Sequence, residues 1–408
     1  MSKRFTSHSS VQRRLHSLLM WMWISRSENA GRFRWLSGLR RLFLMSGAAG
    51  LMACRGRRDE RPHDAPLTLS TVLDESRSKF GVPAMAAIVL GANKVFECQV
   101  TGIARRGRSA PVRTSSRFHL GSNTKAITAT MVATLVEENR LSWDTTVLDV
   151  FPEWSNSIHP DYRGINLNDL FQHHSGLPPY NNATSADMRR LPAGESAAEV
   201  AGFILHRPPA RKPGSGGLYS NAGPAIAAVM AERMTGLSWE TLIRNRIFGP
   251  LGISGGFGWP NAADPLQPSG HVHTWFGPIP TPTFLIHALP PFFRPAGDVH
   301  MCLPDYARFL QSHLNGLQGK DALLQATTVR HLHTARGVFG LGWGVGPHDG
   351  RMTSGHDGSD GTFYVTAALW HERNLAIAVA ANMGGDLASK ACHTVSNAIA
   401  RVYLSRSS

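Results

Sequence analysis

The chain has 408 residues, of which 42% are hydrophobic, so it can bury a large core in one big domain or in two interleaved layers. Its 40 Gly and 25 Pro follow no fixed period, which excludes collagen-like and low-complexity proteins. The formal net charge is +14, but residues 1–58 contain twelve Lys or Arg and one acidic residue, Glu28. The remaining chain is therefore close to neutral, and nucleic acid is not an expected partner.

The basic N-terminal segment is typical of an export signal. The stretch "LRRLFLMSGAAGLMAC" joins Arg40 and Arg41 to an apolar run that is shorter than the roughly 20 residues of a membrane-spanning helix. Its Arg-Arg-x-Phe-Leu order resembles a twin-arginine signal, and its last four residues resemble a lipobox with Cys54 as the lipidated residue. We expect an N-terminal extension and signal peptide over residues 1–58, a tether over residues 59–66, and a location in the bacterial cell envelope, on the periplasmic face of a membrane or in the periplasm. A misplaced start codon before a plain cleaved signal is the alternative.

Strands are predicted near both ends of the remaining chain, with helices between them. A helix is expected over Leu67–Phe80, followed by strands in "PAMAAIVLG" and "KVFECQVTGIARR". Two more strands are expected in "GTFYVTAALW" and "NLAIAVAANMG", before a closing helix in "LASKACHTVSNAIARVYL". This order favours an α+β sandwich with one antiparallel sheet, built from about residues 67–133 and 335–404, and a mostly helical part over residues 134–334.

Three cysteines, Cys98, Cys302 and Cys392, remain if Cys54 carries a lipid. A chain with a large core does not need a disulfide framework, so we expect small buried residues here. Whether two of these three cysteines form a disulfide stays open.

The stretch "FHLGSNTKAITATMVATLVEEN" begins like a strand and continues like a helix. Gly121 gives the corner its conformational freedom, so Ser122 falls on the first helical turn and Lys125 follows on the same face. A hydroxyl becomes a nucleophile when a base takes its proton, and a Lys can be that base if its pKa falls toward about 7–8. Free N–H groups at the start of the helix can bind an oxyanion. A plain N-cap role for Ser122 is the simpler alternative.

A second motif, Tyr219-Ser220-Asn221, follows the Gly-rich loop "RKPGSGG" and precedes a predicted helix. A Tyr219 phenol beside a cationic Lys can shift toward phenolate and carry a proton. Asn221 can hold Lys125 and donate to a substrate amide. A Tyr-Ser-Asn turn without function is the alternative.

A third motif, His356-Asp357-Gly358-Ser359, stands at the predicted entrance to a strand. Gly358 would let a substrate approach the strand edge. The N–H of Ser359 could pair with that of Ser122 as an oxyanion hole.

These three motifs, in this order, resemble those of the beta-lactamase and penicillin-binding superfamily, in particular the class C beta-lactamase, DD-peptidase and esterase group. That group uses Ser-x-x-Lys, Tyr-x-Asn and a Lys/His-x-Gly triplet. The segments "LNDLFQHHSGLPPY", "PAGDVHMCLPDYARFL" and "FGLGWGV" add to the similarity, which runs from about Leu67 to Leu404. The resemblance implies an α+β or α/β sandwich of the beta-lactamase/transpeptidase type, and a serine hydrolase that forms an acyl-enzyme on an ester, amide or peptide carbonyl without a cofactor. Together with the leader sequence, it predicts an exported enzyme.

The resemblance also implies roles for the motif residues. Ser122 is the expected nucleophile, Lys125 and Tyr219 are expected to move its proton, and Asn221 and His356 are expected to orient a small-molecule or peptide substrate, peptidoglycan fragments included. His356 stands where dedicated beta-lactamases carry Lys, and a neutral imidazole holds a substrate carboxylate less firmly. Efficient beta-lactam hydrolysis is therefore less expected than esterase or D-amino peptidase activity. A non-catalytic envelope binding or sensor protein of the same fold is the alternative.

Other motifs are weaker. Ser254 in "GISGG" fits the nucleophile elbow of α/β-hydrolases, but its flanks predict neither the preceding strand nor the following helix. The paired histidines, such as His271 with His273, lack acidic or Cys ligands at suitable spacing, so no metal is expected. The aromatic, Pro-rich run from His273 to Phe293 is interpreted as a lid over the cleft.

Overall fold

The computed structural model describes residues 68–181, 185–282 and 289–405. The chain divides into two compact units, Met1–His63 and Asp64–Ser408, and every described residue belongs to the second. The predicted signal, the tether and Cys54 lie outside the described residues. In the described ranges, no helix combines the length and the apolar character that crossing a bilayer requires.

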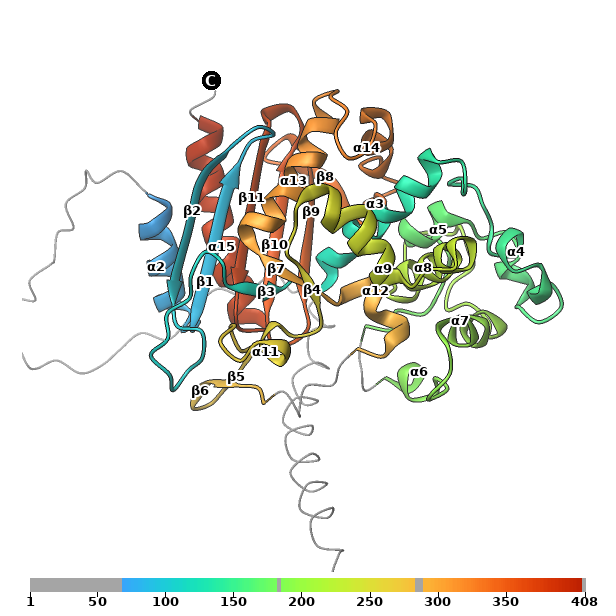
Figure 1. The fold of residues 1–408 in the computed structure, drawn as a ribbon, viewed down its shortest axis with the longest axis horizontal. Coiled ribbons are helices and arrows are strands. Elements are labelled where there is room, and N and C mark those ends of the chain that lie inside the picture. Colours follow the sequence, from blue (N-terminus) through green and yellow to red (C-terminus); the bar gives the residue numbers. More distant parts are fainter. Residues whose placement is uncertain (1–67, 182–184, 283–288, 406–408) are drawn as a thin grey trace, which may run out of the picture. The chain divides into compact units, whose positions relative to one another are not determined.

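Six antiparallel strands form the main sheet, in the order β2-β1-β11-β10-β9-β8 (Figure 1). Strands β1 (Ala84–Leu90) and β2 (Val95–Gly102) come from the N-terminal part of the described chain. Strands β10 (Tyr364–Trp370) and β11 (Leu375–Ala381) come from its C-terminal part, and β11 pairs with β1. The predicted sheet built from both ends of the chain is confirmed.

Two strands of this sheet, β8 (Gly344–His348) and β9 (Arg351–Ser359), are not predicted from the sequence. The expectation that His356 stands at the entrance to the next strand is wrong, because His356 lies within β9, opposite Ala367 of β10. Glycines at positions 344, 346, 355 and 358 make these segments poor strand formers by propensity. Pairing with β10 and with each other overrides that preference.

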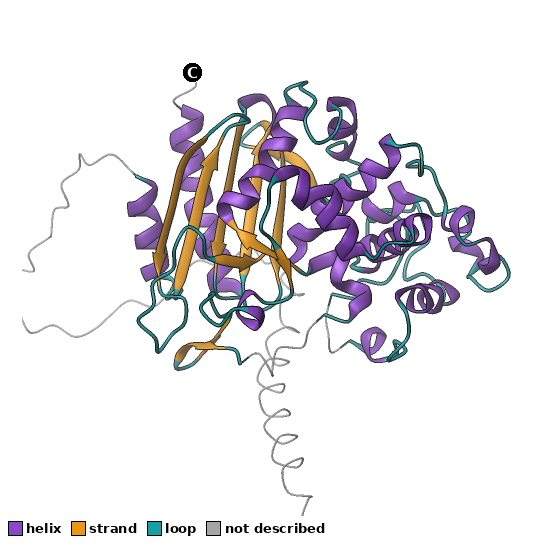
Figure 2. Cartoon of the chain, viewed as in Figure 1, coloured by secondary structure: helices purple, strands orange, loops and turns teal. Residues whose placement is uncertain are grey.

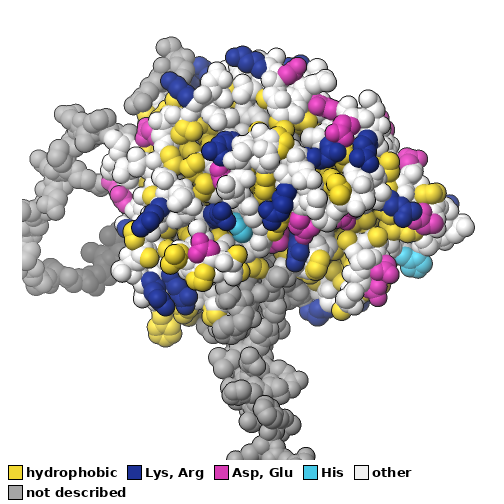
Figure 3. Space-filling model, in the orientation of Figure 1, with side chains coloured by type: hydrophobic (Ala, Val, Ile, Leu, Met, Phe, Trp, Pro, Cys, Tyr) yellow, Lys and Arg dark blue, Asp and Glu magenta, His cyan; other side chains and the backbone are white. Residues whose placement is uncertain are grey.

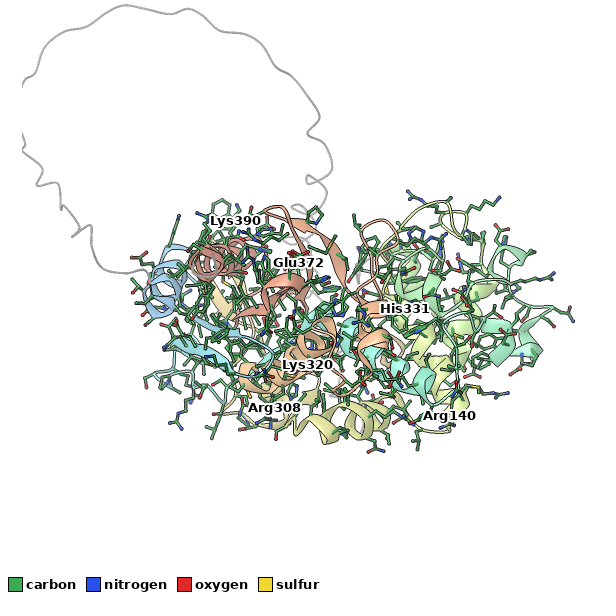
Figure 4. All side chains as sticks on the ribbon, turned by 90° about the horizontal axis from the view of Figure 1, so that it is seen from above. Arg140, Arg308, Lys320, His331, Glu372 and Lys390 are labelled. Carbon is green, nitrogen blue, oxygen red and sulfur yellow. The ribbon has the colours of Figure 1, made fainter. Side chains whose placement is uncertain are left out.

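Helices cover both faces of the main sheet. The two predicted terminal helices, α2 (Leu69–Lys79) and α15 (Asp386–Ser405), pack on one face, and α13 (Leu303–Leu317) packs against β1 and β11 on the other. Figure 4 shows Lys390 of α15 and Arg308 of α13 on opposite sides of the sheet. Because both faces are covered, all of β1 is buried, and its residues alternate between the two cores.

The helices between the two sets of strands form the other half of the described structure (Figure 2). Helix α3 (Thr124–Glu137) is buried on most sides and packs against α8 (Ala222–Thr235) and α12 (Arg294–Gly297). Capping boxes at Thr146, Asn166 and Ser196 start three of the remaining helices by satisfying free N–H groups. The remaining helices are α4 (Val147–Val150), α5 (Leu167–Phe171), α6 (Ala186–Arg189), α7 (Ala197–His206), α9 (Trp239–Ile243), α10 (Gly249–Leu251), α11 (Pro260–Ala263) and α14 (Ala326–Leu332).

Two small sheets complete the described structure. One joins β3 (Arg117–His119), β7 (Val299–Cys302) and β4 (Gly256–Phe257), and it leads directly into the Ser122 turn. The other is the hairpin of β5 (His271–Thr274) and β6 (Gly277–Pro280). The lid expected over His273–Phe293 includes residues 283–288, which lie outside the described part, and it stays a prediction.

The surface and the cysteines bear on two further expectations. Figure 3 shows Lys and Arg interspersed with Asp and Glu over one face, without a continuous basic surface there.

Cys98, Cys302 and Cys392 are all free thiols, and only Cys392 is fully buried. The expectation of small buried residues therefore holds for Cys392, while the other two are half-buried.

Candidate active site

Ser122 lies in a single 3₁₀ turn, Gly121–Asn123, between β3 and α3. Gly121 has φ +51°, and a Cβ at this position would lie 2.3 Å from the backbone N of Ser359. Only glycine fits there, so the Ser122 turn rests directly against the end of β9. The Asn123 side chain fixes the turn from inside by donating to the carbonyl oxygens of Leu120 and Val365, both at 3.1 Å.

Lys125 lies beside Ser122, as the sequence predicts. Its Nζ is 2.9 Å from the Ser122 Oγ and 2.8 Å from the Ala296 carbonyl oxygen. The side chain is fully buried, and this burial lowers the pKa of Lys125 well below its usual value. A neutral amine in this position can donate to Ala296 and accept the Ser122 proton through its lone pair.

Tyr219 completes a compact group with Lys125. The Lys125 Nζ lies 4.9 Å from the centre of the Tyr219 ring, whose other neighbours include the His173 ring at 4.5 Å. Burial raises the pKa of Tyr219 to about 12, although a hydrogen bond with the Ser122 side chain lowers it in part. The phenolate expected from the sequence is therefore not favoured, and the geometry supports a neutral Lys125 beside a protonated Tyr219.

The third motif reaches the same site from β9. A Cβ on Gly358 would lie 2.0 Å from the Leu120 carbonyl oxygen and 2.8 Å from the Ser122 backbone N. Gly358 is thus required for β9 to pack against the Ser122 turn, a different reason from the substrate access expected from the sequence. Ser359 follows at the exposed end of the strand, and its Oγ donates to the Phe363 carbonyl oxygen at 2.6 Å.

His356 lies beside Tyr219, with the two ring centres 6.2 Å apart. Burial is the main cause that lowers the pKa of His356 to about 4, so its imidazole is neutral near pH 7. Its Nδ1 is 2.7 Å from the Asp357 carbonyl oxygen, which assigns the ring proton to Nδ1. The remaining nitrogen, Nε2, is then a hydrogen-bond acceptor.

Asn221 is adjacent to this group but makes a different contact from the expected one. Its Nδ2 donates to the Tyr180 carbonyl oxygen at 2.9 Å. The Lys125 amine instead contacts Ser122 and Ala296. Asn221 therefore ties the Tyr219 segment to Tyr180, a residue with φ +47°.

Three residues at the site are not identified as functional from the sequence. The Ala296 carbonyl is a partner of Lys125. The His173 ring packs on Tyr219 and its Nδ1 accepts from the Ser220 N–H at 3.2 Å. His119, two residues before Gly121, is fully buried and accepts from the Gly121 N–H. A polar residue next to a catalytic motif is the signal that could have found His119.

Ser254 and the paired histidines have structural roles in the described chain. Ser254 follows α10 and its N–H donates to Asp305 at 3.0 Å, so it does not lie on a strand-to-helix elbow. Among the described residues, no group of three or more His, Cys, Asp or Glu side chains is arranged to hold a metal ion. His271 instead forms a hydrogen bond within the protein, with its Nδ1 2.7 Å from the Asn382 carbonyl oxygen.

Comparisons with known proteins place the chain in a family. The model of the family described as "Beta-lactamase" matches residues 69–394. Penicillin-binding protein 4 of Amycolatopsis lactamdurans is 29% identical over 305 residues, covering 71% of this chain and 77% of that protein. Unguisins hydrolase ungD of Aspergillus violaceofuscus is 27% identical over 205 residues, which are 47% of this chain and 35% of that protein.

Solved structures show the same fold. The octameric penicillin-binding protein homologue from Pyrococcus abyssi superposes with a TM-score of 0.68 at 21% identity, covering 82% of this chain and 76% of its own. The D-amino acid amidase from Ochrobactrum anthropi SV3 gives a TM-score of 0.67 at 20% identity, covering 83% of this chain and 98% of its own. The chain therefore belongs to the beta-lactamase family of serine hydrolases.

Proposed function

We propose that this chain hydrolyses an ester, amide or peptide carbonyl through an acyl-enzyme on Ser122. The observation that carries this proposal is the 2.9 Å contact between the Nζ of the fully buried Lys125 and the Oγ of the partly buried Ser122. Burial favours the neutral amine, which is the form that can take the hydroxyl proton. A protein that only binds has no use for this amine.

The residues of the site suggest a complete proton path. Lys125 takes the Ser122 proton as the Oγ forms a bond to the carbonyl carbon, and the resulting oxyanion is stabilised by the N–H groups of Ser122 and Ser359. As the tetrahedral intermediate collapses, the Tyr219 hydroxyl gives its proton to the leaving group and takes one from the Lys125 ammonium. A water molecule then repeats these steps on the acyl-enzyme, which releases the acid and restores Ser122.

The substrate class is supported by the similar proteins. They include a penicillin-binding protein, an unguisins hydrolase and a D-amino acid amidase. Amides and peptides are therefore our first candidates, with Asn221 and His356 orienting the substrate. Peptidoglycan-derived peptides, simple esters and beta-lactams are the further candidates.

Covalent labelling tests the proposal. A fluorophosphonate probe should label the wild-type chain and fail to label Ser122→Ala, whereas Ser254→Ala, the matched control, should be labelled normally. Labelling that persists in Ser122→Ala would overturn the assignment. A wild-type chain that binds candidate substrates but is neither labelled nor active would favour the non-catalytic alternative. Parallel assays with D-Ala dipeptides, p-nitrophenyl esters and nitrocefin identify the substrate class.

We also propose that the protein is exported and anchored through Cys54, on the strength of the leader sequence alone. Cys54→Ser should move the protein from the membrane fraction to the soluble fraction. Replacing Arg40 and Arg41 with Lys should block export if the signal is of the twin-arginine type. A Cys54→Ser variant that stays in the membrane fraction would contradict lipidation.

A further inference from the structure

A cavity of about 590 Å³ begins beside Tyr219 and His356 and continues around the edge of the main sheet, and neither Ser122 nor Lys125 is among its lining residues. Tyr219 and His356 line its near end. Its far end is lined by Asp357 of β9, Thr366 of β10, and His393 and Asn397 of α15. The far end lies on the face of the sheet that α15 covers, which is opposite to the face that carries His356.

The geometry of the strands explains how one cavity reaches both faces. Strand β8 pairs with β9 only as far as Gly355, so the edge of β9 from His356 to Ser359 is free of β8. Side chains alternate along β9. His356 is opposite Ala367, which belongs to the main core, whereas Asp357 is opposite Thr366 and points toward α15. Gly344 and Gly355 line the cavity at the point where the pairing of β8 with β9 ends.

The far end carries an accessible carboxylate. Asp357 is 50% exposed and its Oδ2 lies 3.1 Å from the Nε2 of His393, which is 42% exposed. Burial alone would raise the pKa of Asp357, but the hydrogen bond from His393 helps to hold it below its usual value, so the carboxylate is ionised at neutral pH. No Lys or Arg is among the described residues that line the cavity.

We propose that this far end is a substrate subsite for an amino or guanidinium group, with Asp357 as its anionic partner. The inference rests on the proposed function and adds a substrate class to it, namely peptides or peptide-like amides with a basic side chain. Asp357 and Thr366 form the floor of this subsite, and His393 and Asn397 form its wall.

The free edge of β9 explains why a substrate of Ser122 would reach the subsite. An extended peptide can add to a free strand edge through main-chain hydrogen bonds, and its side chains then point alternately to the two faces. A side chain on the α15 face would enter the far end of the cavity. A basic group there could replace His393 as the partner of Asp357, while a substrate carboxylate would meet a carboxylate and no Lys or Arg.

Matched substrates test the subsite. The substrates are tripeptide p-nitroanilides that carry either Lys or its uncharged counterpart norleucine at one of the two residues before the scissile bond. At one of these two positions, the enzyme should cleave the Lys substrate faster than the norleucine substrate. In Asp357→Asn this Lys-to-norleucine ratio of kcat/KM should fall about tenfold, which corresponds to the loss of one charge contact. Glu372→Gln removes one carboxylate outside the cavity and should leave the ratio unchanged (Figure 4).

A second variant covers the case in which Asp357→Asn does not fold. Asn397→Lys adds a cation to the wall contributed by α15 and should reduce the ratio below that of the wild type. If Ser122→Ala abolishes turnover, the proposed function stands. The subsite would then be overturned by the absence of a Lys preference at both positions, or by a Lys-to-norleucine ratio that neither variant changes. Turnover that survives in Ser122→Ala would instead overturn the proposed function.

Discussion

The Nδ1 of His119 accepts a hydrogen bond from the backbone N–H of Gly121 at 3.2 Å. The same imidazole lies between two carboxylates, with its Nε2 3.6 Å from Asp298 and its Nδ1 4.0 Å from Asp360. Gly121 directly precedes Ser122, and Asp360 directly follows Ser359. One buried side chain thus bonds to the backbone next to Ser122 and lies near the side chain of the residue that follows Ser359.

We expect His119→Ala to lower kcat by about 10- to 100-fold, because a misplaced oxyanion donor weakens stabilisation of the transition state. KM should change less, since His119 does not line the cavity. His119→Asn retains an acceptor near the position of Nδ1 and should recover most of kcat. Steady-state kinetics of both variants, with thermal unfolding as the control for folding, would check this. Equal kcat values for wild type and His119→Ala would contradict the positioning role.

Lys125→Arg should lose about 10²- to 10⁴-fold in kcat/KM, the usual contribution of a general base. The guanidinium stays protonated at all accessible pH values and cannot accept the Ser122 proton. In the wild type, kcat/KM should rise with pH as Lys125 loses its proton and should level off well below pH 10.5, because burial lowers this pKa. A pH profile whose rising limb centres on the ordinary Lys value would contradict the neutral amine.

Lys125→Met should also stabilise the fold near neutral pH while it abolishes turnover. The buried Lys125 must lose a proton when the chain folds, and this costs free energy at any pH below its unfolded pKa. The unfolded state binds more protons, so the wild type gains stability as the pH rises toward the ordinary Lys value, and the advantage of Lys125→Met should shrink. Melting temperatures of both proteins between pH 7 and pH 10 would test this. An advantage that grows with pH would show that Lys125 is charged in the folded state.

Tyr219→Phe should slow amide substrates more than activated esters. With a pKa of about 12, the Tyr219 hydroxyl keeps its proton and can donate it to the leaving group. An amine must be protonated to leave, whereas p-nitrophenolate leaves without help. We therefore expect a loss of about 10²-fold or more for anilides and a smaller loss for p-nitrophenyl esters. Equal losses for the two substrates would place Tyr219 in binding rather than in proton transfer.

The sequence predicts which residues form the site better than it predicts the contacts that these residues make. Ser122 and Lys125 are fixed by helical spacing, so their contact follows from local structure alone. The Asn221 contact with Tyr180 and the Ala296 contact with Lys125 join segments far apart in the chain, and no local pattern encodes them. Strand β9 is not predicted because its glycines lower its strand propensity. One of these glycines, Gly358, is nevertheless the residue that allows β9 to pack on the Ser122 turn.

His356→Lys should shift the preference of the enzyme toward substrates that carry a carboxylate. The wild-type imidazole is neutral near pH 7, and its Nδ1 proton is held by the Asp357 carbonyl oxygen, so it presents an acceptor that repels an anion. A Lys at this position would present a donor and a positive charge, and a hydrogen bond to a charged group contributes about 1.5–3 kcal/mol. We expect the ratio of kcat/KM for nitrocefin to kcat/KM for p-nitrophenyl butyrate to rise about tenfold. The new cation would also lower the pKa of Lys125 further, which affects both substrates, so the ratio is the quantity to measure.

His356→Gln, a neutral side chain that can donate, separates the effect of the donor from that of the charge. A ratio that stays constant in both variants would mean that His356 does not face the anionic end of the substrate.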